Sequence, residues 1–211
     1  MFDLDGTLVD TNIDFSRLKA KILALVEKHG LDPNPFADRH ILELVSQAAS
    51  LMKGRKAAAF TAEANKILEE IEVHSAENGC AVDGANEVLA ALRESGTKIG
   101  IVTRNCRAAA YLSLRKSGLQ AEIVLTREDV ENAKPHPSHL LKALKSLGVE
   151  PENAVMVGDY TIDVEAGKAA GMRTVGFLRP HREPGFFNQI QPDAVIENLR
   201  ELIDVIVGPN C

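Results

Sequence analysis

The second part of the chain alternates apolar segments with helical ones, and this alternation limits the possible folds more than any other feature. From residue 81 onward, short apolar segments of strand length are separated by amphipathic segments of helical length. Continuous apolar strands that alternate with helices indicate a parallel sheet covered on both faces. The predicted strands are residues 98–103, 121–125, 153–158, 173–178 and 193–196, and the predicted helices are residues 84–95, 106–117, 137–147, 161–170 and 197–206.

The first part of the chain has a different hydrophobic pattern. Residues 13–76 show helical spacing without a strand pattern, and the predicted helices are residues 13–29, 37–54 and 56–76. The opening "MFDL" is apolar enough to be a first strand that joins the later sheet. We therefore predict an α/β fold with a Rossmann-like parallel sheet core, formed by residues 1–11 and 80–211, and an inserted all-helical domain at residues 12–79.

Charge and cysteine content narrow the partners. A net charge of −6 and a pI of about 5.6 argue against nucleic acid, which binds basic surfaces. The 3 cysteines form no C-x-x-C motif, which is typical of a reducing compartment. The acidic start does not resemble a signal peptide, and the apolar runs are shorter than the ~18 residues that a membrane span needs. We expect a cytoplasmic protein without a nucleic-acid or membrane partner.

Polar side chains gather where the predicted strands end. Ligands of parallel sheets bind at the carboxyl ends of the strands, so these side chains are candidates for one site. Each residue is common at such a position, and only their shared location is informative. The candidates are Asp3, Asp5, Thr103, Lys134, Asp159 and Asp163.

Asp3 and Asp5 flank one leucine in "DLDGT". On a strand, residues i and i+2 face the same side, roughly 6.6 Å apart, and two carboxylates that close repel each other unless a cation or a proton intervenes. A D-G turn would explain Asp5 and Gly6, but it leaves Asp3 in the apolar run unexplained. The alternative is a nucleophile, Asp3, beside a general acid/base, Asp5.

The remaining candidates suit a phosphoryl group and a hard cation. Asp159 and Asp163 bracket a predicted helix start, where Asp163 could serve only as a cap. Converging carboxylates also suit Mg²⁺. Lys134 and Thr103, which alone would be a surface lysine and a strand threonine, can donate to phosphoryl oxygens. Together the set predicts phosphoryl transfer through an aspartyl-phosphate.

Four segments resemble, in order, the motifs of the haloacid dehalogenase (HAD) superfamily: "DLDGT", "IVTRN", "KPHPSHLLKAL" and "VGDYTIDVEAGKAAGMRTVGF". The resemblance implies that Asp3 is the nucleophile and Asp5 the general acid/base, and that Thr103 and Lys134 hold the phosphoryl group. It also implies Mg²⁺ on Asp3, the backbone carbonyl of Asp5 and Asp159, with support from Asp163. The helical insert is similar to the subclass I cap of the phosphoglycolate phosphatase-like branch.

The same resemblance favours phosphate-ester hydrolysis. The dehalogenases of the superfamily lack the second aspartate of the first motif, and the phosphonoacetaldehyde hydrolases have alanine there, whereas this chain has Asp5. Only Met1 and Phe2 precede Asp3, fewer residues than is usual in the family. Either the first strand is very short, or the sequence starts inside it.

Further residues have more than one interpretation. Arg104 and Asn105 follow Thr103 and are candidates for substrate binding at the mouth of the site, whereas His136 and His139 are expected to be capping or surface groups. Gly6 is a candidate hinge because glycine tolerates unusual backbone angles. A basic stretch in the insert is either a substrate clamp or a solvated loop; it contains Lys53, Arg55 and Lys56.

Several functions remain open at this stage. The leading prediction is a Mg²⁺-dependent phosphatase of a small phosphorylated metabolite, acting as a monomer or homodimer. A phosphomutase of the β-phosphoglucomutase type would share all four motifs. A phospho-aspartate receiver module would also combine acids, a threonine and a lysine, but it needs no helical insert. A catalytically inert binding protein of the same family would not need the intact acids and Lys134.

Overall fold

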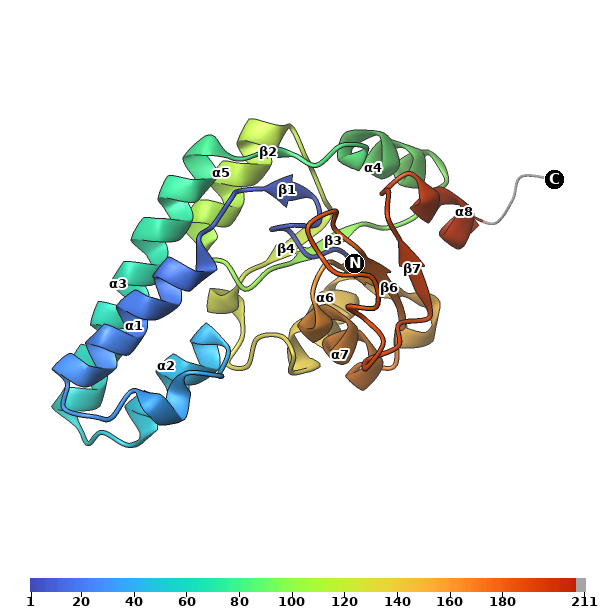
Figure 1. The fold of residues 1–211 in the computed structure, drawn as a ribbon. Helices are drawn as coiled ribbons and strands as arrows, with labels where there is room; N and C mark the ends of the chain where they lie inside the picture. The colour runs from blue at the N-terminus through green and yellow to red at the C-terminus, as the bar shows by residue number, and fades with distance from the viewer. Residues whose placement is uncertain (208–211) are drawn as a thin grey trace. The chain divides into compact units, whose positions relative to one another are not determined.

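The computed structural model describes residues 1–207 and divides the chain into two compact units. The first unit joins residues 1–11 to the chain from Ala76 onward, and the second consists of residues 12–75. The first unit alternates strands and helices, whereas the second is helical (Figure 1). The predicted α/β fold with a helical insert is confirmed. The second junction falls inside helix α3 (Arg55–Asn78), so a single helix runs from one unit into the other.

The strands of the first unit form a parallel sheet with the start of the chain at its centre. Phe2 forms parallel bridges to Ile101 on one side and Val157 on the other. Its amide donates to the Gly100 carbonyl over 2.8 Å, and the Asp3 amide donates to the Val157 carbonyl over 2.9 Å. The predicted first strand is therefore real but very short. The paired strands are β3 (Gly100–Val102) with β4 (Ile123–Leu125), and β5 (Val155–Gly158) with β6 (Arg173–Phe177) and β7 (Ala194–Ile196).

Helices cover the sheet on both faces, as its apolar strands require. Ile101 and Val157 belong to one hydrophobic core, and their neighbours Val102 and Met156 belong to another. Side chains of α4, α5 and α8 contribute to the first core, and those of α6 and α7 to the second. These helices are α4 (Ala85–Glu94), α5 (Arg107–Ser117), α6 (Ser138–Leu147), α7 (Thr161–Ala169) and α8 (Glu201–Val207). Short 3-10 helices lie at Arg127–Asp129 and Pro151–Asn153.

Two features of this unit differ from the sequence-based expectation. Two strands of two residues each, β1 (Val9–Asp10) and β2 (Cys80–Ala81), form an antiparallel pair. They lie in the two segments of the first unit that flank the helical insert in the sequence. Helix α8 begins at Glu201 instead of residue 197. The side chain of Glu201 accepts a hydrogen bond from the Asn198 amide over 2.8 Å and holds a turn ahead of the helix.

The second unit has its own hydrophobic core. It contains α1 (Phe15–Lys28), the 3-10 helix Asn34–Phe36, α2 (Ile41–Ser50) and most of α3. Asp14 caps α1 by accepting a hydrogen bond from the Arg17 amide over 2.8 Å. Helix α2 is shorter than predicted because the 3-10 helix and its following turn occupy the residues before it. The largest buried side chains of this core are Leu18, Ile22, Leu44, Phe60 and Leu68.

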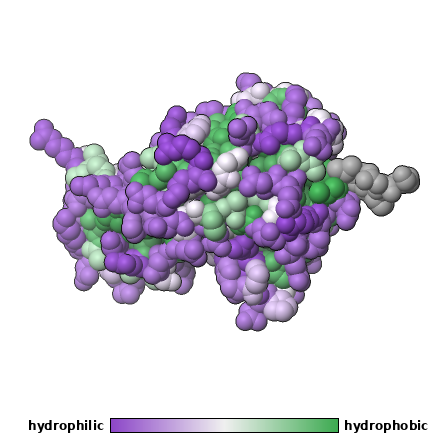
Figure 2. All heavy atoms as spheres, turned by 90° about the horizontal axis from the view of Figure 1, so that it is seen from above, coloured by the Kyte–Doolittle hydropathy of each residue, from purple (hydrophilic) through white to green (hydrophobic). Residues whose placement is uncertain are grey.

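Hydrophilic side chains dominate the face of the molecule seen in Figure 2, with smaller hydrophobic patches between them. No helix within residues 1–207 is both long enough and apolar enough to cross a membrane.

Candidate active site

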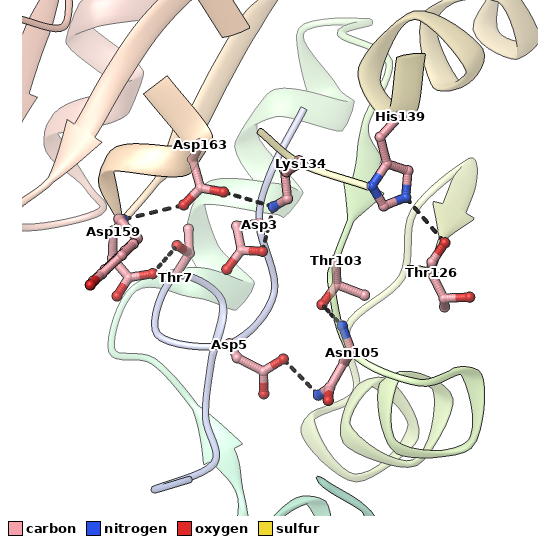
Figure 3. Close-up of polar contacts among 11 residues, drawn as sticks. Asp3, Asp5, Thr7, Thr103, Asn105, Thr126, Lys134, His139, Asp159 and Asp163 are labelled. Carbon is pink, nitrogen blue, oxygen red and sulfur yellow. Dashed lines mark hydrogen bonds and ion pairs between the residues drawn. The ribbon is translucent and has the colours of Figure 1, made fainter. Parts of the chain in front are cut away.

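The predicted site residues come together at the carboxyl end of the central strands. Asp3 directly follows the bridging residue Phe2, Thr103 directly follows β3, and Asp159 directly follows β5. Because these strands are parallel neighbours, their carboxyl ends lie at one edge of the sheet, and Figure 3 shows the side chains facing a common region. Asp3, Thr103 and Asp159 are all buried.

Lys134 lies between two carboxylates. Its Nζ atom donates to Oδ1 of Asp3 over 2.6 Å and to Oδ1 of Asp163 over 2.7 Å (Figure 3). The Lys134 side chain is fully buried, and the exposed fractions of the Asp3 and Asp163 side chains are only 13% and 2%. Asp163 also accepts a hydrogen bond from the Tyr160 amide over 3.2 Å, so it caps α7 as well as pairing with the lysine. The capping role expected for Asp163 is therefore real, and its contact with Lys134 places it in the candidate site as well.

The loop after Asp3 brings a second group to Asp159. The Thr7 hydroxyl donates to Oδ1 of Asp159 over 3.1 Å, and Thr7 is fully buried. Gly6 precedes it with a φ of +87°, a conformation that glycine adopts easily. A Cβ atom on Gly6 would lie 2.4 Å from Oδ2 of Asp159. Gly6 therefore has a packing reason to be glycine, because the loop backbone approaches this carboxylate too closely for any side chain.

The Asp5 carboxylate has different neighbours. It accepts hydrogen bonds from the Thr11 hydroxyl and from the Asn105 side-chain amide, each over 2.7 Å. The Asn105 backbone amide in turn donates to the Thr103 hydroxyl over 3.1 Å. Figure 3 shows Asp5 directed toward Asn105, whereas Asp3 is directed toward Lys134. The two aspartates of "DLDGT" thus lie in distinct environments.

These environments shift the pKa values. Burial raises the pKa of Asp3 to about 7, against the opposing charge of Lys134. Burial also raises the pKa of Asp159 to about 7, and the charges of Asp3 and Asp163 add to that shift. Burial works to lower the pKa of Lys134, but the carboxylates of Asp163 and Asp3 outweigh it and raise the value. Lys134 is therefore an ammonium at neutral pH.

The donor set fits a divalent cation. Asp3, Asp159 and Asp163 each offer one carboxylate oxygen, and these oxygens lie within 4.8 Å of one another. The three carboxylates surround only one ammonium, that of Lys134, so the cluster suits a cation. Oxygen ligands without thiolates suit Mg²⁺. The Asp5 side chain faces away from this cluster, so only its backbone carbonyl is a candidate ligand.

The structure adds residues that the sequence interpretation missed. The partnership of Thr7 with Asp159 and that of Thr11 with Asp5 were not foreseen. The surface role expected for His139 is wrong: His139 is fully buried, and its Nε2 atom lies 3.1 Å from the Thr126 carbonyl. His136 does cap α6, since its Nδ1 atom accepts from the Ser138 amide over 3.2 Å.

The two candidates after Thr103 have different surroundings. Asn105 is buried against Asp5, which makes it a neighbour of the proposed acid/base. The backbone carbonyl of Arg104 accepts a hydrogen bond from Nη1 of Arg127 over 2.9 Å, which fixes this turn.

The similarity to known proteins extends over nearly the whole chain. The N-acetylmuramic acid 6-phosphate phosphatase of Pseudomonas aeruginosa is 30% identical over an alignment of 226 positions. The alignment covers 100% of this chain and 95% of that protein. Pyrophosphatase PpaX of Halalkalibacterium halodurans is 28% identical over 98% of this chain and 95% of its own. The solved structure of a HAD phosphatase from Thermococcus onnurineus is similar with a TM-score of 0.64 and 28% identity, over 98% of this chain and 96% of that one.

The family itself follows from these similarities. Residues 1–177 match the family described as haloacid dehalogenase-like hydrolase, and this stretch contains all four motifs quoted from the sequence. The resemblance inferred from those motifs is confirmed, and so is the expectation of a hydrolytic enzyme. The chain belongs to the haloacid dehalogenase-like hydrolase family.

Proposed function

We propose that this hydrolase is a Mg²⁺-dependent phosphatase that cleaves a small phosphorylated metabolite through an aspartyl-phosphate on Asp3. The observation that carries the proposal is the buried contact between Asp3 and Lys134 beside two further carboxylates. Relatives named as a phosphatase and a pyrophosphatase support phosphate compounds as the substrate class. N-acetylmuramic acid 6-phosphate and pyrophosphate are therefore among the candidate substrates.

The chemistry assigned to the two N-terminal aspartates has two halves. In the first, a carboxylate oxygen of Asp3 attacks the phosphorus atom, the bond to the leaving oxygen breaks, and Asp5 donates a proton to that oxygen. In the second, water attacks the phosphorus atom, Asp5 accepts the proton of that water, and the bond from phosphorus to Asp3 breaks. Phosphate is released and both carboxyl groups return to their first state. The hydrogen bonds from Thr11 and Asn105 orient Asp5 for this exchange.

The other residues position the phosphoryl group. Lys134 and the Thr103 hydroxyl are the proposed donors to its oxygens, and Arg104 is a further candidate for substrate contact. Asp3, Asp159 and the backbone carbonyl of Asp5 would hold Mg²⁺, with Asp163 in support. When bound, the cation would supply positive charge that offsets the negative charge of the phosphoryl oxygens. We further propose, from the family resemblance alone, that the helical insert at residues 12–79 acts as a cap that limits the access of water to the site.

The central test replaces Asp3 with asparagine, which removes the nucleophile but keeps the side-chain shape. We expect Mg²⁺-dependent release of p-nitrophenol from p-nitrophenyl phosphate to fall by about 10³-fold or more. Asp83→Asn is the matched control, because Asp83 is an exposed acid of the same unit, 85% exposed, that pairs with Arg200. Normal turnover by purified Asp3→Asn protein would overturn the assignment of the nucleophile.

The substrate class needs a separate measurement. We propose a phosphate-release panel that contains phosphoglycolate, sugar phosphates, nucleotides, pyrophosphate and N-acetylmuramic acid 6-phosphate. A phosphomutase would convert a sugar phosphate, in the presence of the sugar bisphosphate, with little release of inorganic phosphate. Strong release from one compound supports the phosphatase, whereas conversion without release would replace it with the phosphomutase.

A further inference from the structure

The segment between β6 and β7, residues 178–193, carries an arginine that lies on two aromatic rings. The guanidinium carbon of Arg182 is 4.9 Å from the ring centroid of Tyr160 and 4.6 Å from that of Phe186. The two rings are themselves in contact, with centroids 5.6 Å apart and an interplanar angle of 55°. Arg182 is therefore held by two cation–π contacts, which fix the guanidinium without using its hydrogen-bond donors.

This arginine lies beside the candidate active site. Tyr160 directly follows Asp159, whose carboxylate belongs to the acid cluster. The Tyr160 ring on which Arg182 lies therefore brings the guanidinium close to this cluster. The guanidinium is thus a cation at the margin of a strongly acidic site.

Arg182 has no acidic partner of its own in the described part of the chain. The ion pairs of residues 1–207 include those of Arg107, Arg179 and Arg200, but none that involves Arg182. Its Nε atom is buried and lacks a hydrogen-bond partner among the described residues. A buried polar nitrogen is nearly always hydrogen-bonded in a folded protein. A guanidinium with an unsatisfied nitrogen, beside the candidate active site, is therefore suited to an anion that the protein itself does not supply.

The segment that carries Arg182 is held in place independently of any ligand. At its start, Nη2 of Arg179 lies 2.6 Å from Oδ2 of Asp10 on β1. At its end, the Nζ atom of Lys168 on α7 donates to the Ile190 carbonyl over 2.7 Å, and the segment runs back beside α7 (Figure 1). Between them, the ring of Phe187 packs on β6 so closely that a Cβ atom on Gly176 would lie 2.8 Å from it. A preorganised donor loses little conformational freedom when it binds an anion.

We propose that Arg182 is a specificity-determining residue that binds a second anionic group of the substrate, a carboxylate or a phosphate, next to the phosphoryl group that is transferred. The proposal rests on the proposed phosphatase function of the same site. The ring contacts use none of the N–H donors of the guanidinium, and a planar fork can bind an anion through two parallel hydrogen bonds. The preferred substrates are therefore phosphomonoesters with an acidic leaving group, or pyrophosphate.

The test compares substrates that differ in one group. Ethyl phosphate and phosphoglycolate have the same two-carbon skeleton, but only phosphoglycolate ends in a carboxylate; pyrophosphate presents a second phosphate instead. We expect the wild-type enzyme to prefer phosphoglycolate or pyrophosphate over ethyl phosphate in kcat/KM. In Arg182→Gln we expect that preference to fall about 10-fold to 100-fold, the usual range for a charge-assisted hydrogen bond. Arg182→Lys keeps the charge and should retain part of the preference, and Arg173→Gln, at an exposed arginine of β6, should retain all of it.

The outcomes separate the two proposals. Loss of preference in Arg182→Gln, with phosphoglycolate or pyrophosphate as the affected substrate, supports the inference and says which anion is bound. Hydrolysis of p-nitrophenyl phosphate without any wild-type preference for the doubly anionic substrates overturns it while the phosphatase stands. Absence of hydrolysis of every substrate overturns both. If Arg182→Gln does not fold by circular dichroism, the wild-type preference must still weaken as salt is raised, and a salt-independent preference contradicts the role of the charge.

Discussion

Replacing Lys134 with methionine removes the ammonium that lies between the carboxylates of Asp3 and Asp163, while it keeps a side chain of similar length. The lysine is fully buried, and its Nζ atom is 2.6 Å and 2.7 Å from the two carboxylate oxygens. Removal of one partner of a buried ion pair typically costs about 3–5 kcal/mol of unfolding free energy. A domain has only about 5–15 kcal/mol in total, so the effect is large and measurable.

The pH dependence of this loss distinguishes a charge effect from a packing effect. The pKa of Asp3 is about 7 in the folded protein, where burial raises it from the ordinary value of 3.8. The folded protein therefore binds more protons than the unfolded chain between these values, and stability falls as pH rises through that window. Without the lysine, which lowers the pKa of Asp3, the shift is larger. The destabilisation caused by Lys134→Met should thus be greater at pH 8 than at pH 5.

The assay is urea unfolding in a metal chelator at pH 5 and pH 8, repeated with Mg²⁺ at pH 8. We expect Mg²⁺ to narrow the difference between the variant and the wild type, because the cation replaces part of the lost positive charge. Lys145→Met, at an exposed lysine on α6, is the matched control and should change stability by less than about 0.5 kcal/mol. A loss of stability that is equal at both pH values and insensitive to Mg²⁺ would refute the charge argument.

Two further predictions concern other residues of this region. Gly6 and Gly96 both have positive φ angles, +87° and +78°, but a Cβ atom would lie 2.4 Å from Oδ2 of Asp159 at Gly6 and would meet nothing within 4 Å at Gly96. Both alanine variants should lose about 1–2 kcal/mol of unfolding free energy because of the backbone conformation. Only Gly6→Ala should also weaken the affinity for Mg²⁺. If the Mg²⁺ titration of its activity matches that of the wild type, the packing role of Gly6 is contradicted. Burial lowers the pKa of His139 from 6.5 to about 3. Between these pH values the folded protein binds fewer protons than the unfolded chain. The free energy of unfolding therefore falls by up to about 1.4 kcal/mol per pH unit as pH falls below 6.5. His139→Gln should lack this part of the acid sensitivity in urea unfolding at pH 6.5, 5.5 and 4.5, and parallel curves for the two proteins would show that the histidine does not remain neutral.

The sheet could be predicted because its strands are apolar on both faces. Ile101 and Val102 pack into different cores, so the sequence shows a continuous apolar run instead of an alternation, and such runs are recognisable. The pair β1 and β2 could not be predicted, since each strand has only two residues. Strands of this length are specified by pairing partners, which a local pattern does not contain.

The candidate site was predictable only in part for the same reason. A polar residue at the end of an apolar strand, such as Asp3 or Asp159, is visible in the local pattern. The hydrogen bonds from Thr7 to Asp159 and from Asn105 to Asp5 join residues that are 152 and 100 positions apart. The burial of His139 depends on which way one helical side chain points. Such facts follow from the tertiary packing and have no signature in the neighbouring residues.

The position of Phe2 at the centre of the sheet has a consequence for the synthesis of the protein. Its partners Ile101 and Val157 lie about 100 and 155 residues later in the chain, and Asp163 follows still later. During translation, at about 5–20 residues per second, Asp3 waits for roughly 8–30 seconds before its strand can be paired on both sides. The nascent polypeptide therefore carries Asp3 long before Lys134, Asp159 and Asp163 are made, so the candidate site can assemble only after residue 163 has emerged from the ribosome.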